Sequence, residues 1–171
     1  MSAIHTKEKN SDSVFSDLKV DEPPGFLFVD HIAIAVRVGE LENQVRMYQQ
    51  IGFRELHREE IGGSDQVREV LLQIGESPNL IQLLEPMSVD SPVQKQIDRS
   101  GGRGGLAHVG FRVKNAQVAF DFFKAKNFRV IDAAPRPGSR GTTVFFLHPK
   151  SHEDSPFGVL YEIVEDSQKQ I

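Results

Sequence analysis

Phe26–Val36 is apolar except for two polar residues, and its second half alternates between two kinds of side chain, as in a strand whose two faces have different surroundings. One face carries isoleucines and a valine, and the other carries His31 beside two alanines. Large apolar side chains on one face predict a helix packed against it. Small residues beside a histidine on the other face predict a cavity.

An apolar pattern with helical spacing follows this strand, and Gly52 ends it. Three more stretches with strand-like alternation follow before the linker begins at Pro86. The first unit is therefore predicted to comprise strand Phe26–Val36, helix Glu40–Ile51, and strands Phe53–Arg58, Val67–Ile74 and Asn79–Glu85.

A linker from Pro86 to Arg103, with a short helix near Pro92–Arg99, leads into a second run of the same order. The second unit is predicted to comprise strand Leu106–Val113, helix Ala116–Lys126, and strands Phe128–Ile131, Thr142–Leu147 and Gly158–Glu165. A loop rich in glycine and proline, Ala134–Gly141, separates its second and third strands. The repeat predicts an α+β chain of two tandem βαβββ modules.

Residues 1–24 are polar and weakly periodic, so we predict a flexible N-terminal tail. We assign residues 25–87 to the first module, 88–103 to the linker and 104–171 to the second module. The two modules are expected to form one structural domain.

A histidine holds the same place in both units. His31 in DHIAIAV (30–36) and His108 in GGLAHVGFRV (104–113) share the pattern H-x-x-x-x-V. The last strand of each unit carries a polar partner, Gln82 at a spacing of 51 residues and Glu162 at a spacing of 54. Two imidazoles, an amide oxygen and a carboxylate suit a divalent metal of borderline character. The repeat therefore predicts a metal site with coordination positions left for a substrate.

Composition narrows the functional classes. The formal net charge of −4, from 24 acidic and 20 basic residues, argues against a general nucleic-acid surface. Because cysteine is absent, disulfides and thiolate metal sites are excluded, and a reducing compartment is consistent with the sequence. No apolar run reaches transmembrane length, and the first 20 residues lack the apolar core of a secretory signal. We expect a cytoplasmic protein without membrane or nucleic-acid partners.

Several short segments spread over residues 28–165 resemble one known family. They are DHIAIAV (30–36), LLEP (83–86), SPVQKQI (91–97), GLAHVGF (105–111), and FLHPKS (146–151) with GVLYEI (158–163). Together they are similar to the vicinal oxygen chelate superfamily and, within it, to methylmalonyl-CoA epimerases. The chain departs from that pattern at Ala107, where the family usually has a second histidine, and in a longer loop, His152–Phe157.

The resemblance implies a curved, barrel-like mixed sheet around a metal site. It implies His31, Gln82, His108 and Glu162 as the ligands of one divalent ion, with cobalt, nickel, manganese, zinc and iron all compatible. It also implies a small acyl-thioester substrate, and it leaves open a homodimer.

Epimerisation defines the chemistry that such a site needs. A divalent cation with one carboxylate ligand can bind two substrate oxygens and stabilise the enolate formed when the carbon between them loses a proton. A general base must reach that carbon, and delivery to the opposite face requires a second acid/base group. By strand alternation Glu69 points into the predicted cavity, so we expect it to be one of these groups. Glu162 or a water is the expected second group.

Simpler interpretations apply to the remaining candidates. Glu69 could be a solvated charge at a sheet edge, and Gln82 a satisfied polar residue of the core. We expect His5 to be inert and His57 to be a solvated strand residue. We expect His148 to order a turn, while His152 could touch substrate. We expect four further basic residues to be ordinary surface charges: Arg103, Arg136, Arg140 and Lys150. A subset of them could hold coenzyme A phosphates.

Three functional classes therefore remain open. The first is a cofactor-independent epimerase of a coenzyme A thioester. The second is another metal enzyme on this scaffold: a glyoxalase-type isomerase, an iron dioxygenase, or a tailoring enzyme acting on a carrier-bound thioester. The third is a non-enzymatic protein that binds a small molecule. Two histidines and one carboxylate suffice for a non-haem iron site, so Gln82 as a fourth ligand favours redox-neutral isomerisation.

Overall fold

The computed structural model describes residues 25–151 and 156–165, so the predicted tail and His152 lie outside it. The strands are β1 (Phe26–Ala35), β2 (Phe53–Ile61), β3 (Val67–Ile74), β4 (Leu80–Pro86), β5 (Gly105–Val113), β6 (Arg136–Pro137), β7 (Thr143–Leu147) and β8 (Leu160–Glu165). The helices are α1 (Leu41–Gln50), α2 (Pro92–Arg99) and α3 (Ala116–Ala125), with a short 3₁₀ turn η2 at Ser139–Gly141.

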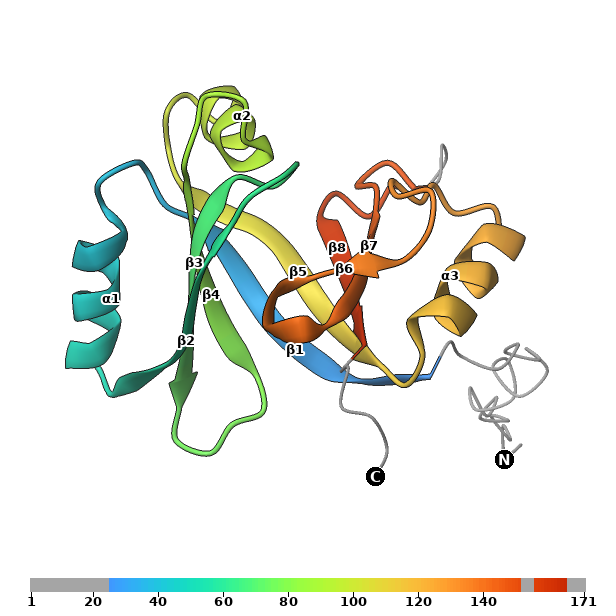
Figure 1. Cartoon of the computed structure of the whole chain (residues 1–171), viewed down its shortest axis with the longest axis horizontal. Coiled ribbons are helices and arrows are strands. Elements are labelled where there is room, and N and C mark those ends of the chain that lie inside the picture. The colour runs from blue at the N-terminus through green and yellow to red at the C-terminus, as the bar shows by residue number, and fades with distance from the viewer. Residues whose placement is uncertain (1–24, 152–155, 166–171) are drawn as a thin grey trace, which may run out of the picture.

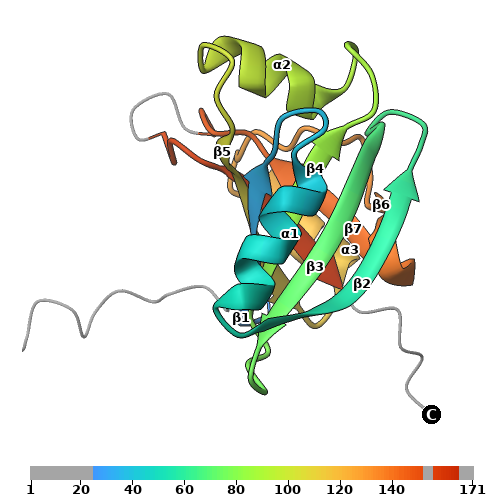
Figure 2. The same cartoon turned by 90° about the vertical axis from the view of Figure 1, so that its left-hand side faces the viewer.

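All the strands belong to one eight-stranded sheet with the order β2-β3-β4-β1-β5-β8-β7-β6. In each half the first strand lies parallel to the last, β1 beside β4 and β5 beside β8. The two halves join where β1 and β5 run antiparallel at the centre of the sheet. The sheet curls, with α1 and α3 on its outer side and α2 above one end (Figures 1 and 2). The predicted α+β class and curved mixed sheet are confirmed.

Strand β1 separates helix-facing from cavity-facing side chains largely as its pattern predicts. Ala33 and Ala35 are buried on the inner face, and Val36, just beyond the strand, packs with Leu41 and Val45 of α1. Ile32, in contrast, keeps 41% of its surface exposed. The helix therefore covers only the later part of the strand, which leaves the earlier part of the outer face open.

Helix α3 covers the outer face of the second half. Asn115 caps it by accepting a hydrogen bond from the Val118 N–H at 2.8 Å. Phe120 and Phe123 pack on Phe145 of β7, with ring centroids 5.3 and 6.2 Å away. Burial of these aromatic side chains anchors the helix and holds β7 and β8 in place beneath the site.

The predicted strand at Phe128–Ile131 is wrong. Only one bridge, Val130 to Leu147, forms in this segment. The ladder stops there because the Asp132 carboxylate accepts the hydrogen bond of the Phe146 N–H, at 2.7 Å. Strand β6 instead forms inside the predicted glycine- and proline-rich loop, where it pairs with β7. The 3₁₀ turn η2 follows it in the same loop.

The described helices can be compared with the length and apolar character of a membrane span. Within residues 25–151 and 156–165, none of them has both the length and the apolar character needed to cross a bilayer.

Candidate active site

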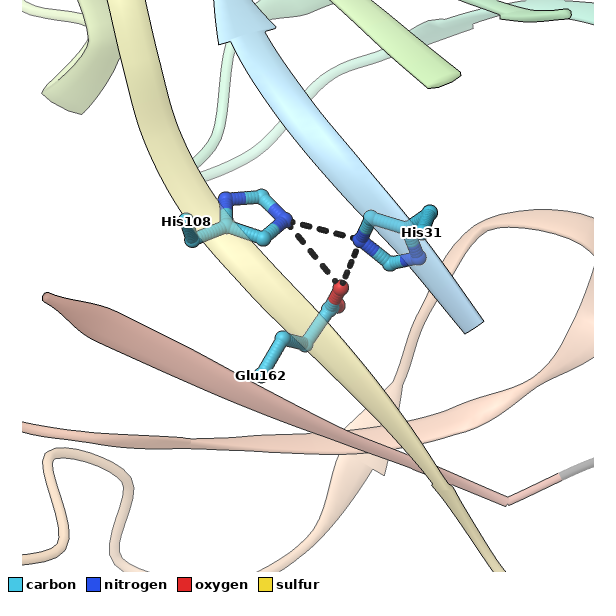
Figure 3. A group of neighbouring side chains, drawn as sticks. All are labelled: His31, His108 and Glu162. Carbon is cyan, nitrogen blue, oxygen red and sulfur yellow. Dashed lines mark hydrogen bonds and ion pairs between the residues drawn. The ribbon is translucent and has the colours of Figure 1, made fainter. Parts of the chain in front are cut away.

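Three strands bring His31, His108 and Glu162 together on the inner face of the sheet, as Figure 3 shows. His31 lies on β1, His108 on β5 and Glu162 on β8, and these strands are neighbours. The His31 Nε2 atom lies 3.0 Å from His108 Nε2 and 3.0 Å from Glu162 Oε2. His108 Nε2 lies 3.3 Å from the same carboxylate oxygen. Three donor atoms thus converge on one point.

The His31 ring is fixed from behind by Asp30. His31 Nδ1–H donates to Asp30 Oδ1 at 2.8 Å, so Nε2 is left to face the other two residues. Asp30 is 1% exposed and also accepts hydrogen bonds from Arg112 Nε at 2.8 Å and from Arg140 Nη2 at 3.1 Å. Two cations therefore hold the carboxylate that orients His31.

Gly110 makes room for this arrangement on β5. A Cβ atom at this position would lie 2.4 Å from Cε1 of the His31 ring and less than 3 Å from both of its nitrogens. Because Asp30 fixes the ring, a side chain at this position could be accommodated only by moving the histidine out of the cluster.

The electrostatics of the cluster reflect burial and close pairing. Burial opposes protonation of His31, but hydrogen bonds with Asp30 and Glu162 outweigh it and raise the pKa of His31 to about 9. Burial also opposes ionisation of Glu162, yet hydrogen bonds from His108 and His31 hold its pKa well below the usual range. Burial lowers the pKa of His108, against the pull of Glu162. Without metal, these contacts favour the protonated form of His31 and the ionised form of Glu162.

Glu69 and Gln82 lie side by side on β3 and β4 and line the same cavity as His108 and Glu162. Gln82 Nε2–H donates to Glu69 Oε2 at 2.7 Å. Among the described residues, Glu69 Oε1 and Gln82 Oε1 are buried with no hydrogen-bond partner. Burial raises the pKa of Glu69, while the nearby Ser139 hydroxyl and the Gln82 amide oppose the rise.

The cavity has a volume of about 480 Å³. Its wall is mainly apolar, and the polar side chains that line it include Glu69, Gln82, His108 and Glu162. The apolar lining includes Val67, Leu84, Leu106, Val144 and Phe146. Such a wall suits a small organic acyl group whose polar atoms reach the cluster.

The donor set fits a divalent metal. Two imidazole nitrogens and a carboxylate oxygen face one another, and Gln82 offers a buried amide oxygen that no residue in the described ranges hydrogen-bonds. A buried oxygen without a hydrogen-bond partner destabilises the fold, so a metal-ligand role for Gln82 accounts for its buried, unpartnered Oε1. Imidazole and oxygen donors are typical of zinc, iron, nickel, cobalt and manganese. The four predicted ligands thus remain a consistent set.

Other residues of the site differ from the sequence-based expectations. Arg140 is not an ordinary surface charge, because it pairs with buried Asp30, and Arg136 pairs with Asp65 and Asp132. His57 is half-buried, and its Nε2 lies 3.1 Å from Glu59 Oε2 and 3.9 Å from Glu69 Oε1. The alternation of His57, Glu59 and Ile61 along β2 was the available signal for its inward face.

His148 behaves as expected, since its Nδ1 accepts a hydrogen bond from the Lys150 N–H at 3.0 Å and orders the turn after β7.

Comparison with known proteins identifies the family of the chain. The sequence pattern of the Glyoxalase/Bleomycin resistance protein/Dioxygenase superfamily matches residues 30–146. The chain belongs to this superfamily. The match includes His31, Gln82 and His108 and ends before Glu162.

Relatives within the superfamily confirm the resemblance to methylmalonyl-CoA epimerases. The mitochondrial methylmalonyl-CoA epimerase of Dictyostelium discoideum is 35% identical over 92 residues, which are 54% of this chain and 52% of that protein. The ethylmalonyl-CoA/methylmalonyl-CoA epimerase of Cereibacter sphaeroides is 29% identical over 71% of this chain and 88% of its own length.

The structural similarity covers nearly the whole length of one solved epimerase structure. A variant of the Streptomyces coelicolor methylmalonyl-CoA epimerase, in complex with 2-nitronate-propionyl-CoA, is 32% identical with a TM-score of 0.74. The alignment covers 84% of this chain and 99% of that one. The chain spans about half the length of the Dictyostelium protein that it matches.

Proposed function

We propose that the chain is a metal-dependent epimerase that inverts C2 of a 2-methylmalonyl-CoA-like thioester by removing and returning a proton. One observation carries the proposal: Glu69, whose buried Oε1 has no hydrogen-bond partner among the described residues, lines the same cavity as His108 and Glu162, which converge with His31. The relatives named as epimerases support this choice of reaction.

The proposed substrate suits the mixed apolar and polar lining of the cavity. Its C2 carries a methyl group and lies between a carboxylate and a thioester, so the apolar wall can receive the methyl group while the oxygens reach the cluster. With a divalent metal held by His31, Gln82, His108 and Glu162, the site supplies Lewis acidity that lowers the cost of negative charge on those oxygens. The surrounding apolar residues exclude water from the reacting carbon.

Glu69 is proposed as one acid/base group. Gln82 holds its Oε2, which leaves Oε1 to accept the proton from C2. Because burial raises its pKa, the carboxylate is a stronger base than one in water, and its protonated form can return the proton. Glu162 is proposed as the second group, acting on the opposite face of C2.

The alternatives that the sequence leaves open fit these residues less well. A non-haem iron dioxygenase needs only the two histidines and one carboxylate, and this would leave the buried Gln82 Oε1 without a role. A simple binding protein would have no use for the uncompensated Glu69 Oε1. Four protein donors with an adjacent base favour redox-neutral proton transfer.

Interconversion of the two C2 epimers tests the proposal. The metal-loaded protein, given a single epimer of methylmalonyl-CoA, should produce a mixture of both. Chelation of the metal should stop the reaction, and readdition should restore it. Separation of the epimers by chiral chromatography measures the product. A protein with one metal ion held by His31, Gln82, His108 and Glu162 that leaves the single epimer unchanged contradicts the proposal.

A further inference from the structure

A second group of ligand-type side chains lies beside the proposed base, at the edge of the sheet. His57 and Glu59 lie on β2, and Glu69 lies directly opposite Glu59 on β3. His57 Nε2 is 3.1 Å from Glu59 Oε2 and 3.9 Å from Glu69 Oε1, and all three donor atoms lie within 4.8 Å of one another. No member of this cluster is one of the four proposed metal ligands.

The state of Glu69 indicates that this cluster is incomplete in the protein alone. Its side chain is 1% exposed, and its Oε1 atom, which lies 3.9 Å from His57 Nε2, has no hydrogen-bond partner within the part of the chain that the structure describes. Like-charged residues directly opposite each other on adjacent strands destabilise a sheet, and Glu59 and Glu69 form such a pair. A buried carboxylate oxygen facing a second carboxylate and an imidazole is a position where a cation is favoured.

We propose that His57, Glu59 and Glu69 form a second divalent-cation site, which takes zinc and inhibits the protein. Zinc binds imidazole nitrogen and carboxylate oxygen at about 2.0–2.2 Å, so tetrahedral donors lie about 3.3–3.6 Å apart. The two distances from His57 Nε2, 3.1 and 3.9 Å, lie on either side of this separation. Water completes the fourth position from the solvent side.

Access and charge also suit this site. The side chains of His57 and Glu59 are 32% and 41% exposed, so an ion can enter from solution while Glu69 supplies the buried ligand. Two carboxylates supply two negative charges. The Arg140 guanidinium donates to Asp30 and its single positive charge also acts on Glu69, while the Arg140 backbone N–H donates to Glu59 Oε2 at 3.3 Å. The cluster therefore keeps a net attraction for a dication.

The consequence for activity follows from which oxygen the ion takes. Gln82 already holds Glu69 Oε2, so the cation binds Oε1, the oxygen assigned to the proton of C2. A carboxylate bound to zinc in this way no longer acts as a base. This inhibitory role rests on the proposed function, whereas binding of the second ion does not.

Metal stoichiometry tests the binding, independently of catalysis. Metal-free protein titrated with zinc alone should bind two equivalents, measured by elemental analysis after desalting and by calorimetry. His57→Gln and Glu59→Gln should each bind one, and so should a His31→Ala/His108→Ala variant. The matched control is Glu60→Gln, on the same strand but paired with exposed Arg68, and it should bind two. One equivalent in the unaltered protein overturns the site, as does a second equivalent that persists in His57→Gln.

Turnover with and without excess zinc tests the inhibition. The protein with its first site loaded should lose activity by about 10²-fold or more when the second equivalent binds, the usual worth of a general base. Under the same conditions, His57→Gln should keep most of the turnover rate that it shows without excess zinc. A second equivalent that binds without loss of turnover overturns the inhibitory role. A protein that is inactive with only its first site loaded, and that still binds a second equivalent of zinc, disproves the epimerase assignment and leaves the second site standing.

Discussion

Removing the charge of Asp30 should strongly destabilise the metal-free protein. The Asp30 carboxylate is almost wholly buried and accepts hydrogen bonds from His31, Arg112 and Arg140. Asp30→Asn keeps the shape of the side chain but withdraws the negative charge from these three groups. Removing one partner of a buried ion pair typically costs about 3–5 kcal/mol, because the remaining charges stay in a poorly solvating environment.

The pKa of Asp30 supports a cost of this order. Burial opposes ionisation, but the hydrogen bond from His31 and the charges of His31, Arg112 and Arg140 lower the pKa of Asp30 from 3.8 to about 2. A depression of this size corresponds to about 2–3 kcal/mol of folding free energy. Since the folded pKa is the lower one, this stabilisation is fully present above pH 3.8 and is lost as the pH falls through about 2.

Urea unfolding of the chelator-treated proteins at neutral pH measures the effect. With an m-value of about 2 kcal/mol/M, Asp30→Asn should lower the midpoint by about 1.5–2.5 M. The control is Glu55→Gln, which removes a surface partner of Arg58 and should cost at most about 1 kcal/mol. A midpoint shift for Asp30→Asn no larger than that of Glu55→Gln refutes the reasoning.

Three further predictions concern metal binding. His108→Ala should remove most of the metal bound at the first site, because loss of one ligand weakens the whole chelate; full metal content by elemental analysis in this variant and in His31→Ala contradicts the ligand assignment. Gly110→Ala should also lower metal content, since its Cβ would lie 2.4 Å from the His31 ring; unchanged metal affinity would show that the ring can move. Metal affinity should rise by up to about tenfold per pH unit until about pH 9, because the metal displaces the proton held by His31; competition titrations that give a flat profile between pH 7 and pH 9 count against this.

The sequence predicted the parts of the site that periodicity controls. A histidine at the same place in each repeat brings His31 and His108 to adjacent central strands, and strand alternation directs Glu69 inward. Both inferences need only the two-residue period of a strand and the symmetry of the repeat. They do not depend on which loops connect the strands.

The contacts that were missed depend on long-range register. Asp30 meets Arg112 across 82 residues and Arg140 across 110, and no local pattern encodes either pairing. His57 faces Glu69 because the pairing of β2 with β3 shifts between Glu55 and His57. Such an irregularity moves the side chains that follow it to new partners, and a single sequence does not specify it.

Hydrogen exchange at C2 tests the central claim most directly. Methylmalonyl-CoA incubated with the metal-loaded protein in deuterium oxide should gain deuterium at C2, without oxygen or a redox cofactor, as followed by mass spectrometry. Glu69→Gln keeps the shape of the side chain but cannot accept the proton, so exchange should slow by about 10²–10⁴-fold while metal content at the first site stays unchanged. Protein with only its first metal site occupied that incorporates no deuterium at C2, or a Glu69→Gln variant that exchanges at the unaltered rate, would contradict the account.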